Sequence, residues 1–321
     1  MKKSLLALAV LGAFAGAASA QSSVTLYGRV DLSVGKNLGA SAKVLQNGSG
    51  SRLGFRGVED LGGGLKAIFN IEHRFNADTG AMTDAARMWG ARSLVGLQGG
   101  FGQITLGREY TTSFLMSQLI NDPWGYDTVT AAAVTRVTGA GIAKVRNDNA
   151  ITYNVSAAGL NFGLQTAEKD APAGTTTPFV TRPVNMAVNG TFGPIAFNAS
   201  YEKTGEANGA KVTSLAGYYD LGVARLGLNI VKGTTAAGTD ADGWLLTATA
   251  PAGAGQFRAA LGQRKTNSVK DTNVVALGYH YNLSKRTTVY GDFVTENKRA
   301  GSATYNASEK NGYDFGLKHN F

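Results

Sequence analysis

The sequence contains no cysteine among its 321 residues. Disulfide bonds, thiol redox chemistry and cysteine-ligated metal sites are therefore excluded, and the fold must gain its stability in other ways. Proline is also scarce, with 6 residues against 43 glycines, and the glycines follow no collagen-like period. This composition favours a chain of many strands and tight turns over a disordered one.

Long hydrophobic runs are missing as well. A transmembrane helix needs roughly 18 or more apolar residues, whereas residues 5–14 form a run of only ten and no later segment reaches that length. This run follows Lys2 and Lys3 and precedes the small residues at 18–20, which is the pattern of a secretory signal peptide rather than a membrane anchor. We therefore expect residues 1–20 to be a cleaved signal peptide and Gln21 to begin the mature chain.

Acidic residues are fewer than basic ones, 22 against 31, and the formal net charge is +9. Without Lys2 and Lys3 the charge would be +7. On a soluble protein such an excess suggests binding to nucleic acid or to anionic surfaces. A secreted chain is not expected to have a nucleic-acid partner, so the direction in which the positive charge faces becomes the important question.

The sequence has instead a marked period of two. In residues 24–34 apolar side chains alternate with polar ones that include Tyr27, Arg29 and Asp31, and the same alternation recurs around 160–165, 195–202, 256–262 and 312–321. Such alternation is typical of strands with one apolar and one polar face. Seven short turns separate eight longer polar stretches, at roughly 36–49, 77–85, 109–146, 168–182, 203–210, 232–241, 265–272 and 298–311. We therefore expect an all-β fold, a sixteen-stranded antiparallel transmembrane β-barrel with short periplasmic turns and long extracellular loops.

A soluble all-β sandwich or solenoid is the alternative. A sandwich has a core about 10 Å thick, so three hundred residues would need two or more such domains. The sequence shows no linker, no boundary rich in proline or serine, and no fixed repeat of 20–50 residues. A single barrel domain over residues 21–321 is the favoured interpretation, although residues 87–97 fit either register.

Several segments carry a resemblance to a known family: 23–28 (SVTLYG), 51–62 (SRLGFRGVEDLG), 94–97 (LVGL), 101–108, 146–149 (RNDN) and 316–321 (GLKHNF). In this order and spacing the chain resembles the trimeric general diffusion porins of Gram-negative bacteria, in particular their β-proteobacterial branch. The resemblance implies a homotrimer in the cell outer membrane, in contact with lipid and lipopolysaccharide, whose third loop folds into a water-filled pore for small ions and solutes. The terminal Phe321 resembles the signal that the outer-membrane assembly machinery reads; it could equally be an aromatic residue at the membrane interface.

In this family arginines on one barrel wall face acidic residues on the third loop. Residues 109–146 form by far the longest connection, and long loops in compact folds are usually functional. We expect the constriction to consist of a basic wall and a loop with acidic residues, formed by Arg29, Arg52, Arg74 and Arg146 and by Asp122 and Asp127, respectively. Guanidinium groups fixed in a narrow lumen raise its anion occupancy, which predicts mild anion selectivity. Any one of these arginines could instead be an ordinary solvated charge, because alternation gives the face but not the depth.

The chain departs from the family pattern at two places. Ala91 stands where the family usually has an arginine, and we expect the neighbouring Arg92 to point outward, toward a trimer contact. The sequence DPWGYD at 122–127 replaces the usual acidic loop tip. Both departures bear on the acids and arginines that set the selectivity.

Other functions find less support in the sequence. An outer-membrane protease or lipase would need a histidine near a carboxylate and often a serine; His73 and His319 fall at apolar-facing positions, and His280 faces the lumen without an evident partner. A substrate-specific channel or an adhesin is the other alternative, but the three tryptophans are scattered rather than lined up. No metal-ligand spacing and no phosphate-binding glycine loop is present, so we expect no enzyme activity, cofactor or metal.

Overall fold

The computed structural model describes residues 22–169, 179–298 and 310–321. The expected signal peptide, Gln21 and parts of the expected loops at 168–182 and 298–311 lie outside the described residues. The strands are β1 (Ser23–Lys36), β2 (Lys43–Asn47), β3 (Ser51–Gly62), β4 (Leu65–Phe75), β5 (Arg92–Gly99), β6 (Gly102–Tyr110), β7 (Arg146–Ala157), β8 (Leu160–Ala167), β9 (Val184–Phe192), β10 (Ile195–Lys203), β11 (Lys211–Asp220), β12 (Arg225–Thr234), β13 (Asp240–Ala252), β14 (Gly255–Thr266), β15 (Val269–Asn282), β16 (Thr287–Lys298) and β17 (Asn311–Asn320). The helical segments are η1 (Phe114–Gln118), α2 (Leu119–Asn121), α3 (Ala131–Thr138) and η2 (Ala207–Gly209).

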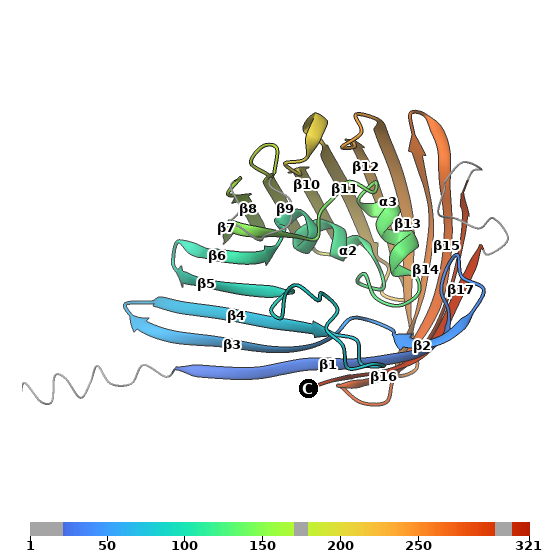
Figure 1. Ribbon diagram of the computed structural model, residues 1–321, viewed down its shortest axis with the longest axis horizontal. Helices are drawn as coiled ribbons and strands as arrows, with labels where there is room; N and C mark the ends of the chain where they lie inside the picture. The colour runs from blue at the N-terminus through green and yellow to red at the C-terminus, as the bar shows by residue number, and fades with distance from the viewer. Residues whose placement is uncertain (1–21, 170–178, 299–309) are drawn as a thin grey trace, which may run out of the picture.

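The strands form one closed antiparallel barrel (Figure 1). From β3 onward each strand pairs with the next, and β17 pairs back with β1, from Arg29 opposite Asn320 to Lys36 opposite Tyr313. Both β2 and β3 pair with β1, so together they take the place of one strand. The sixteen-stranded barrel expected from the sequence is therefore confirmed.

The break between β2 and β3 corrects one expectation. Residues 43–47 lie inside the stretch 36–49 that was expected to be loop, yet they pair with the loop end of β1. Residues 48–50 bulge out of the ladder there, and the buried Asp31 accepts a hydrogen bond from the Ser49 hydroxyl. The bulge places Ser49 and Gly50 inside the barrel, next to the arginine side chains described below.

The two alternating sets of side chains face the lumen and the outer surface of the barrel, respectively. On β11, Ser214 and Tyr218 are buried in the lumen, whereas Leu215 and Tyr219 are 57% and 49% exposed on the outer surface. An outer apolar band of this kind is what a barrel presents to hydrocarbon. In the described part of the chain, no helix is long and apolar enough to span a membrane.

One expected long connection is a tight turn instead. Between β14 and β15 only Asn267 and Ser268 remain outside the strands, where the sequence suggested a loop over 265–272. Both residues have positive φ, 48° and 65°, the backbone form that matches the twist of a two-residue hairpin. Asparagine tolerates this left-handed conformation. Because the turn needs only two residues, the neighbouring residues 265–266 and 269–272 belong to the strands.

The connection between β6 and β7, residues 111–145, is called the inner loop here. It lies inside the ring of strands, where α2 and α3 are seen in green in Figure 1. Val134 and Val137 of α3 are fully buried and pack with Leu245, Val274 and other small apolar residues on the inner wall of β13–β16. Apolar side chains on an inward face thus give the inner loop a dry docking surface on one wall of the lumen.

Candidate functional site

A cavity of ≈ 720 Å³ lies between the inner loop and the wall formed by the first half of the barrel. Its lining includes all six residues expected at the constriction, which are Arg29, Arg52, Arg74, Arg146, Asp122 and Asp127. The structure therefore brings together side chains from β1, β3, β4, β7 and the inner loop. It also adds residues that the sequence did not single out.

Three arginines stand in one row across neighbouring strands. Arg29 lies directly opposite Arg52, and Arg52 lies directly opposite Arg74. Directly opposite residues in a sheet have Cβ atoms about 4.5–5.5 Å apart, and like charges in this position are destabilising. The barrel thus concentrates positive charge at one height of the lumen at a cost to its own stability.

Glu72 and Tyr110 hold this row in place. Oε1 of Glu72 lies 3.9 Å from Nη1 of Arg52 and 3.6 Å from Nε of Arg74. The Tyr110 hydroxyl oxygen accepts hydrogen bonds from Arg74 at 2.8 Å and from Arg146 at 2.6 Å. The guanidinium of Arg146 also lies 4.1 Å from the Tyr110 ring centre, within cation–π range. One acid and one aromatic ring thus fix three cations.

Arg92 belongs to the same cluster, and the expectation that it points outward is wrong. Its Nε lies 2.9 Å from Oε1 of Glu109, and its guanidinium is 4.9 Å from the Tyr110 ring centre. The reason is register: β5 begins at Arg92, which shares the inward face with the buried Leu94, while Val95 faces out. Arg92 therefore supplies the lumen with a guanidinium group, although position 91, where the family usually has an arginine, is an alanine.

The two expected acids of the inner loop have different surroundings. Oδ2 of Asp127 forms an ion pair with Nη1 of Arg29 at 2.7 Å and so joins the loop to the row of arginines. Asp122 is 3% exposed, and its carboxylate accepts the backbone N–H groups of Trp124 and Tyr126 at 2.9 and 2.8 Å. These bonds hold a turn in which Tyr126 has a positive φ of 63°. Burial raises the pKa of Asp122 to about 7, so this side chain is only partly ionised at neutral pH.

Arg258 of β14 and Lys318 of β17 also line the cavity and were not expected there. Lys318 lies close to the row of arginines, because β17 pairs with β1. The signal was present, since both residues fall on the polar face of their alternating strands, but alternation does not give the height along the barrel. In all, seven cationic and three acidic side chains line the cavity. The three acids are Glu72, Asp122 and Asp127.

Four other carboxylates hold the inner loop to the second half of the barrel. Asp292 accepts the Trp124 indole N–H at 2.7 Å, and Asp314 accepts the Val129 backbone N–H at 3.1 Å. The remaining two contacts join the Lys144 backbone N–H to Glu202 at 2.9 Å and the Arg136 guanidinium to both oxygens of Glu296. These four acids, termed the loop anchors, fix the inner loop across the lumen.

His280 has a partner, contrary to the expectation from the sequence. Its Nε2 lies 3.0 Å from Oδ2 of Asp292 on the neighbouring strand β16, in the buried region below the inner loop. Since Asp292 also accepts the Trp124 indole N–H, this histidine–carboxylate pair supports a loop anchor. Over the described ranges, no group of three or more histidines and carboxylates could hold a metal ion.

Comparison with known proteins decides the family. A model of the Gram-negative porin family matches residues 7–301. The chain belongs to the Gram-negative porins. It is 33% identical to outer membrane porin protein 32 of Delftia acidovorans over 361 residues, covering 100% of both chains. It is 30% identical to an outer membrane porin protein of Bordetella pertussis over 364 residues, covering 90% of this chain and 93% of the relative.

Solved porin structures agree with the fold. The anion-selective porin from Comamonas acidovorans superposes with a TM-score of 0.76 at 28% identity, covering 94% of this chain and 100% of that chain. OmpT of Vibrio cholerae shares the fold, with a TM-score of 0.70 at 17% identity and coverage of 94% and 99%. Family, relatives and closed barrel together make this chain a non-enzymatic channel protein of the outer membrane.

Proposed function

We propose that the cavity is the constriction of a water-filled channel through which small hydrophilic solutes and ions diffuse passively, with a mild preference for anions. The observation that carries this proposal is the row of Arg29, Arg52 and Arg74. These side chains remain 20–25% exposed to the lumen although they are held on several sides. A row of like charges lowers the stability of the barrel, and its attraction for anions that pass through the channel explains why it is present.

The preference for anions follows from local charge. Guanidinium groups stay ionised, and in a narrow passage with low-dielectric walls they raise the local anion concentration. Charges on distant loops matter little, because solvent screens them beyond about 8–10 Å at ordinary salt. The relative from Comamonas acidovorans is described as anion-selective, which supports the same sign here.

A homotrimer in contact with outer-membrane lipid and lipopolysaccharide completes the proposal, and it rests on the family resemblance. Recognition by the outer-membrane assembly machinery is assigned to Phe321, whose backbone exchanges two hydrogen bonds with Gly28 at 3.0 and 3.1 Å. The last residue thus ends the strand that closes the barrel. Chemical cross-linking of the detergent-solubilised protein tests the trimer. Cross-linked dimer and trimer bands are expected, and a monomer band alone would contradict the trimer.

The test of selectivity is the reversal potential across a planar bilayer under a KCl gradient. The wild-type channel is expected to favour chloride, and Arg52→Gln combined with Arg146→Gln is expected to lower the chloride-to-potassium permeability ratio severalfold. Lys265→Gln combined with Lys270→Gln is the matched control, because both lysines are exposed near the loop end of the barrel. A cation-favouring wild type, or equal ratios in the two double variants, would contradict the proposal.

A further inference from the structure

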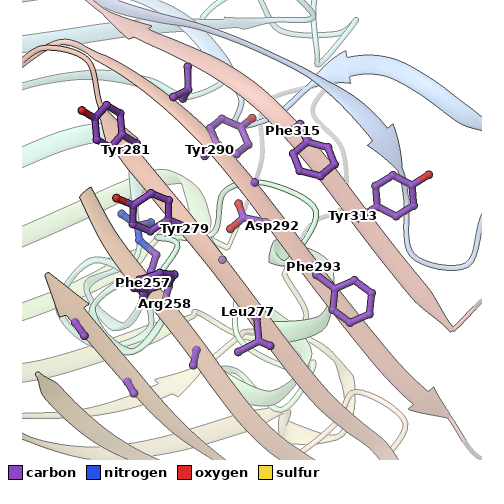
Figure 2. A pocket seen from close by; sticks show the side chains of 16 residues that line it. Phe257, Arg258, Leu277, Tyr279, Tyr281, Tyr290, Asp292, Phe293, Tyr313 and Phe315 are labelled. Atoms are coloured by element: carbon purple, nitrogen blue, oxygen red, sulfur yellow. The ribbon is translucent and has the colours of Figure 1, made fainter. Parts of the chain in front are cut away.

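The outer surface of β13–β17 carries a broad apolar groove of ≈ 1120 Å³ (Figure 2). One cross-strand row explains its shape: Phe257 lies opposite Tyr279, Tyr279 opposite Gly291, and Gly291 opposite Phe315. Phe257 and Tyr279 thus form one wall and Phe315 forms the other, and the trough runs between them at Gly291, which has no side chain. A Cβ atom added at Gly291 would lie 3.0 Å from the Phe315 ring, which shows that the trough is narrow there.

The walls are continuous. Phe257 packs on Tyr279 with ring centres 4.6 Å apart, Tyr279 approaches Tyr281 at 6.4 Å, and Tyr313 lies 6.3 Å from Phe315 on the other side. The Tyr279 hydroxyl donates to the carbonyl of Ala252 at 2.9 Å, so one wall is also fixed to the adjacent turn. These contacts give the groove a stable shape.

The groove fits within one membrane leaflet. Its outward-facing pairs run from Tyr281 and Val289, next to the β15–β16 turn, to Leu277 and Phe293 further up. Four residues of strand span about 14 Å along the strand, which is about 10–11 Å of membrane depth for a strand tilted by about 35–45°. Half of a hydrocarbon core about 30 Å thick is about 15 Å, so these pairs fit within one leaflet. Because tight turns lie at the periplasmic end of such barrels, the groove belongs to the periplasmic leaflet.

The turn below the groove carries the complementary charge. Lys285 and Arg286 are adjacent and exposed in the connection between β15 and β16. Among the turns at this end of the described barrel, it is the one with two neighbouring cations. Cations next to a membrane surface attract anionic lipids. Two such residues together raise the affinity by about tenfold or more.

We propose that this groove and turn bind one anionic phospholipid of the periplasmic leaflet, with an acyl chain in the trough at Gly291 and the phosphate at Lys285 and Arg286. The observations favour a lipid over a second copy of this chain. A copy docked by the same face about a two-fold axis would bring an identical dibasic turn toward the first, whereas a phospholipid brings a negative charge. In the proposed homotrimer a contact at this groove would instead join it to a different face of the neighbouring subunit, and a loss of subunit contacts in Gly291→Leu would identify that case. The site lies outside the lumen and is independent of the selectivity proposed above.

Native mass spectrometry of the protein in a nonionic detergent tests the site. Phosphatidylglycerol and phosphatidylcholine with identical acyl chains are added at equal concentration. The wild type is expected to retain phosphatidylglycerol in preference, and Lys285→Gln combined with Arg286→Gln is expected to lower this retention by about tenfold. Lys265→Gln combined with Lys270→Gln makes the same charge change at the other end of the barrel and is expected to leave retention unchanged.

A second pair of variants tests the trough. Gly291→Leu fills it and is expected to lower retention of both lipids, while Gly217→Leu places the same side chain on the outer face of β11, where no atom lies within 4 Å of the added Cβ. All variants are expected to keep wild-type single-channel conductance, because the substituted positions lie outside the lumen, and this shows that they are folded. Equal retention of the two lipids by the wild type, or equal retention by Gly291→Leu and Gly217→Leu, would overturn the site. So would a Gly291→Leu protein that loses subunit contacts while it keeps its lipid, since the groove would then be a protein interface.

Discussion

The two walls of the lumen use charge in opposite ways. On the wall of β1–β7 the arginines keep a fifth to a quarter of their side chains exposed to the passage. On the wall of β10–β17 the loop anchors Glu202, Asp292, Glu296 and Asp314 are at most 3% exposed, because the inner loop covers them. The acids therefore hold the loop, whereas in the proposed channel the arginines act on the solute. The balance of charges in the whole sequence is thus a poor guide to the field in the pore.

The strongest effect is expected where the inner loop loses its attachment to the wall of β10–β17. Trp124→Ala removes a buried indole and its hydrogen bond to Asp292, and a large-to-small change of this kind costs about 3–5 kcal/mol. The inner loop should then leave the wall for part of the time. Single-channel recordings are expected to show larger and unsteady current levels.

The matched control for this prediction is Trp244→Ala. Trp244 lies opposite the outward-facing Ile230 on the outer surface of the barrel, so its removal should leave the current levels as in the wild type. Steady, wild-type currents in Trp124→Ala would show that the other anchors suffice to hold the loop.

Asp127→Asn tests the ion pair between the inner loop and the wall of β1–β7. It removes the ion pair with Arg29 at 2.7 Å and leaves that guanidinium without its acid at the edge of the cavity. The chloride-to-potassium permeability ratio from reversal potentials is expected to rise above the wild-type value. A lower ratio would mean that Asp127 places Arg29 in the pore rather than neutralising it.

The pH dependence of selectivity sharpens the contrast between the two loop acids. Burial raises the pKa of Asp122 to about 7 from its ordinary value near 3.8, with Arg258 and Asp127 as its charged neighbours. Asp122 is therefore neutral in acid and gains a negative charge as the pH rises through about 7, which should lower the preference for anions. The turn held by Asp122 is likewise expected to be most stable at low pH and to weaken as the pH rises toward 7.

Asp122→Asn should remove this step in the permeability ratio between pH 6 and pH 8, the range that brackets a pKa of about 7. The comparison variant is Asp127→Asn, which should shift the ratio and keep the step. A step that persists in Asp122→Asn would assign the titration to another group.

The smallest effect is expected at Tyr110→Phe. The substitution keeps the ring under Arg146 and Arg92 but removes the hydroxyl that accepts from Arg74 and Arg146. Selectivity should fall slightly while the mean conductance is kept. Tyr153→Phe, which removes a hydroxyl bonded to the carbonyl of Phe101 at an exposed site near a turn, should change neither.

The period of two, together with the seven short turns and eight longer stretches, was enough to predict the barrel and its strand number, and the period also gave the faces of Arg29, Arg52 and Arg74. It could not give the height of Arg258 and Lys318, because every second residue of a long strand shares one face. It left residues 87–97 open to either register, and the outward direction expected for Arg92 from the family pattern was wrong, because β5 begins at Arg92 with this side chain on the inward face. It also concealed the docking surface for α3, since Val274 and Val275 are both apolar although one faces the loop and the other faces out. Contacts between distant segments, such as the four loop anchors, have no local signature in the sequence.

The anchoring of the inner loop also orders the events of assembly. Trp124 finds its acceptor 168 residues later in the chain, and Val129 finds its acceptor 185 residues later. Contacts of such long range form late, because the chain between them must first be arranged. The cavity between the inner loop and the row of arginines can therefore take its final shape only after the last strands have joined the barrel. A nascent or truncated barrel would lack the anchored inner loop and would therefore enclose a wider lumen.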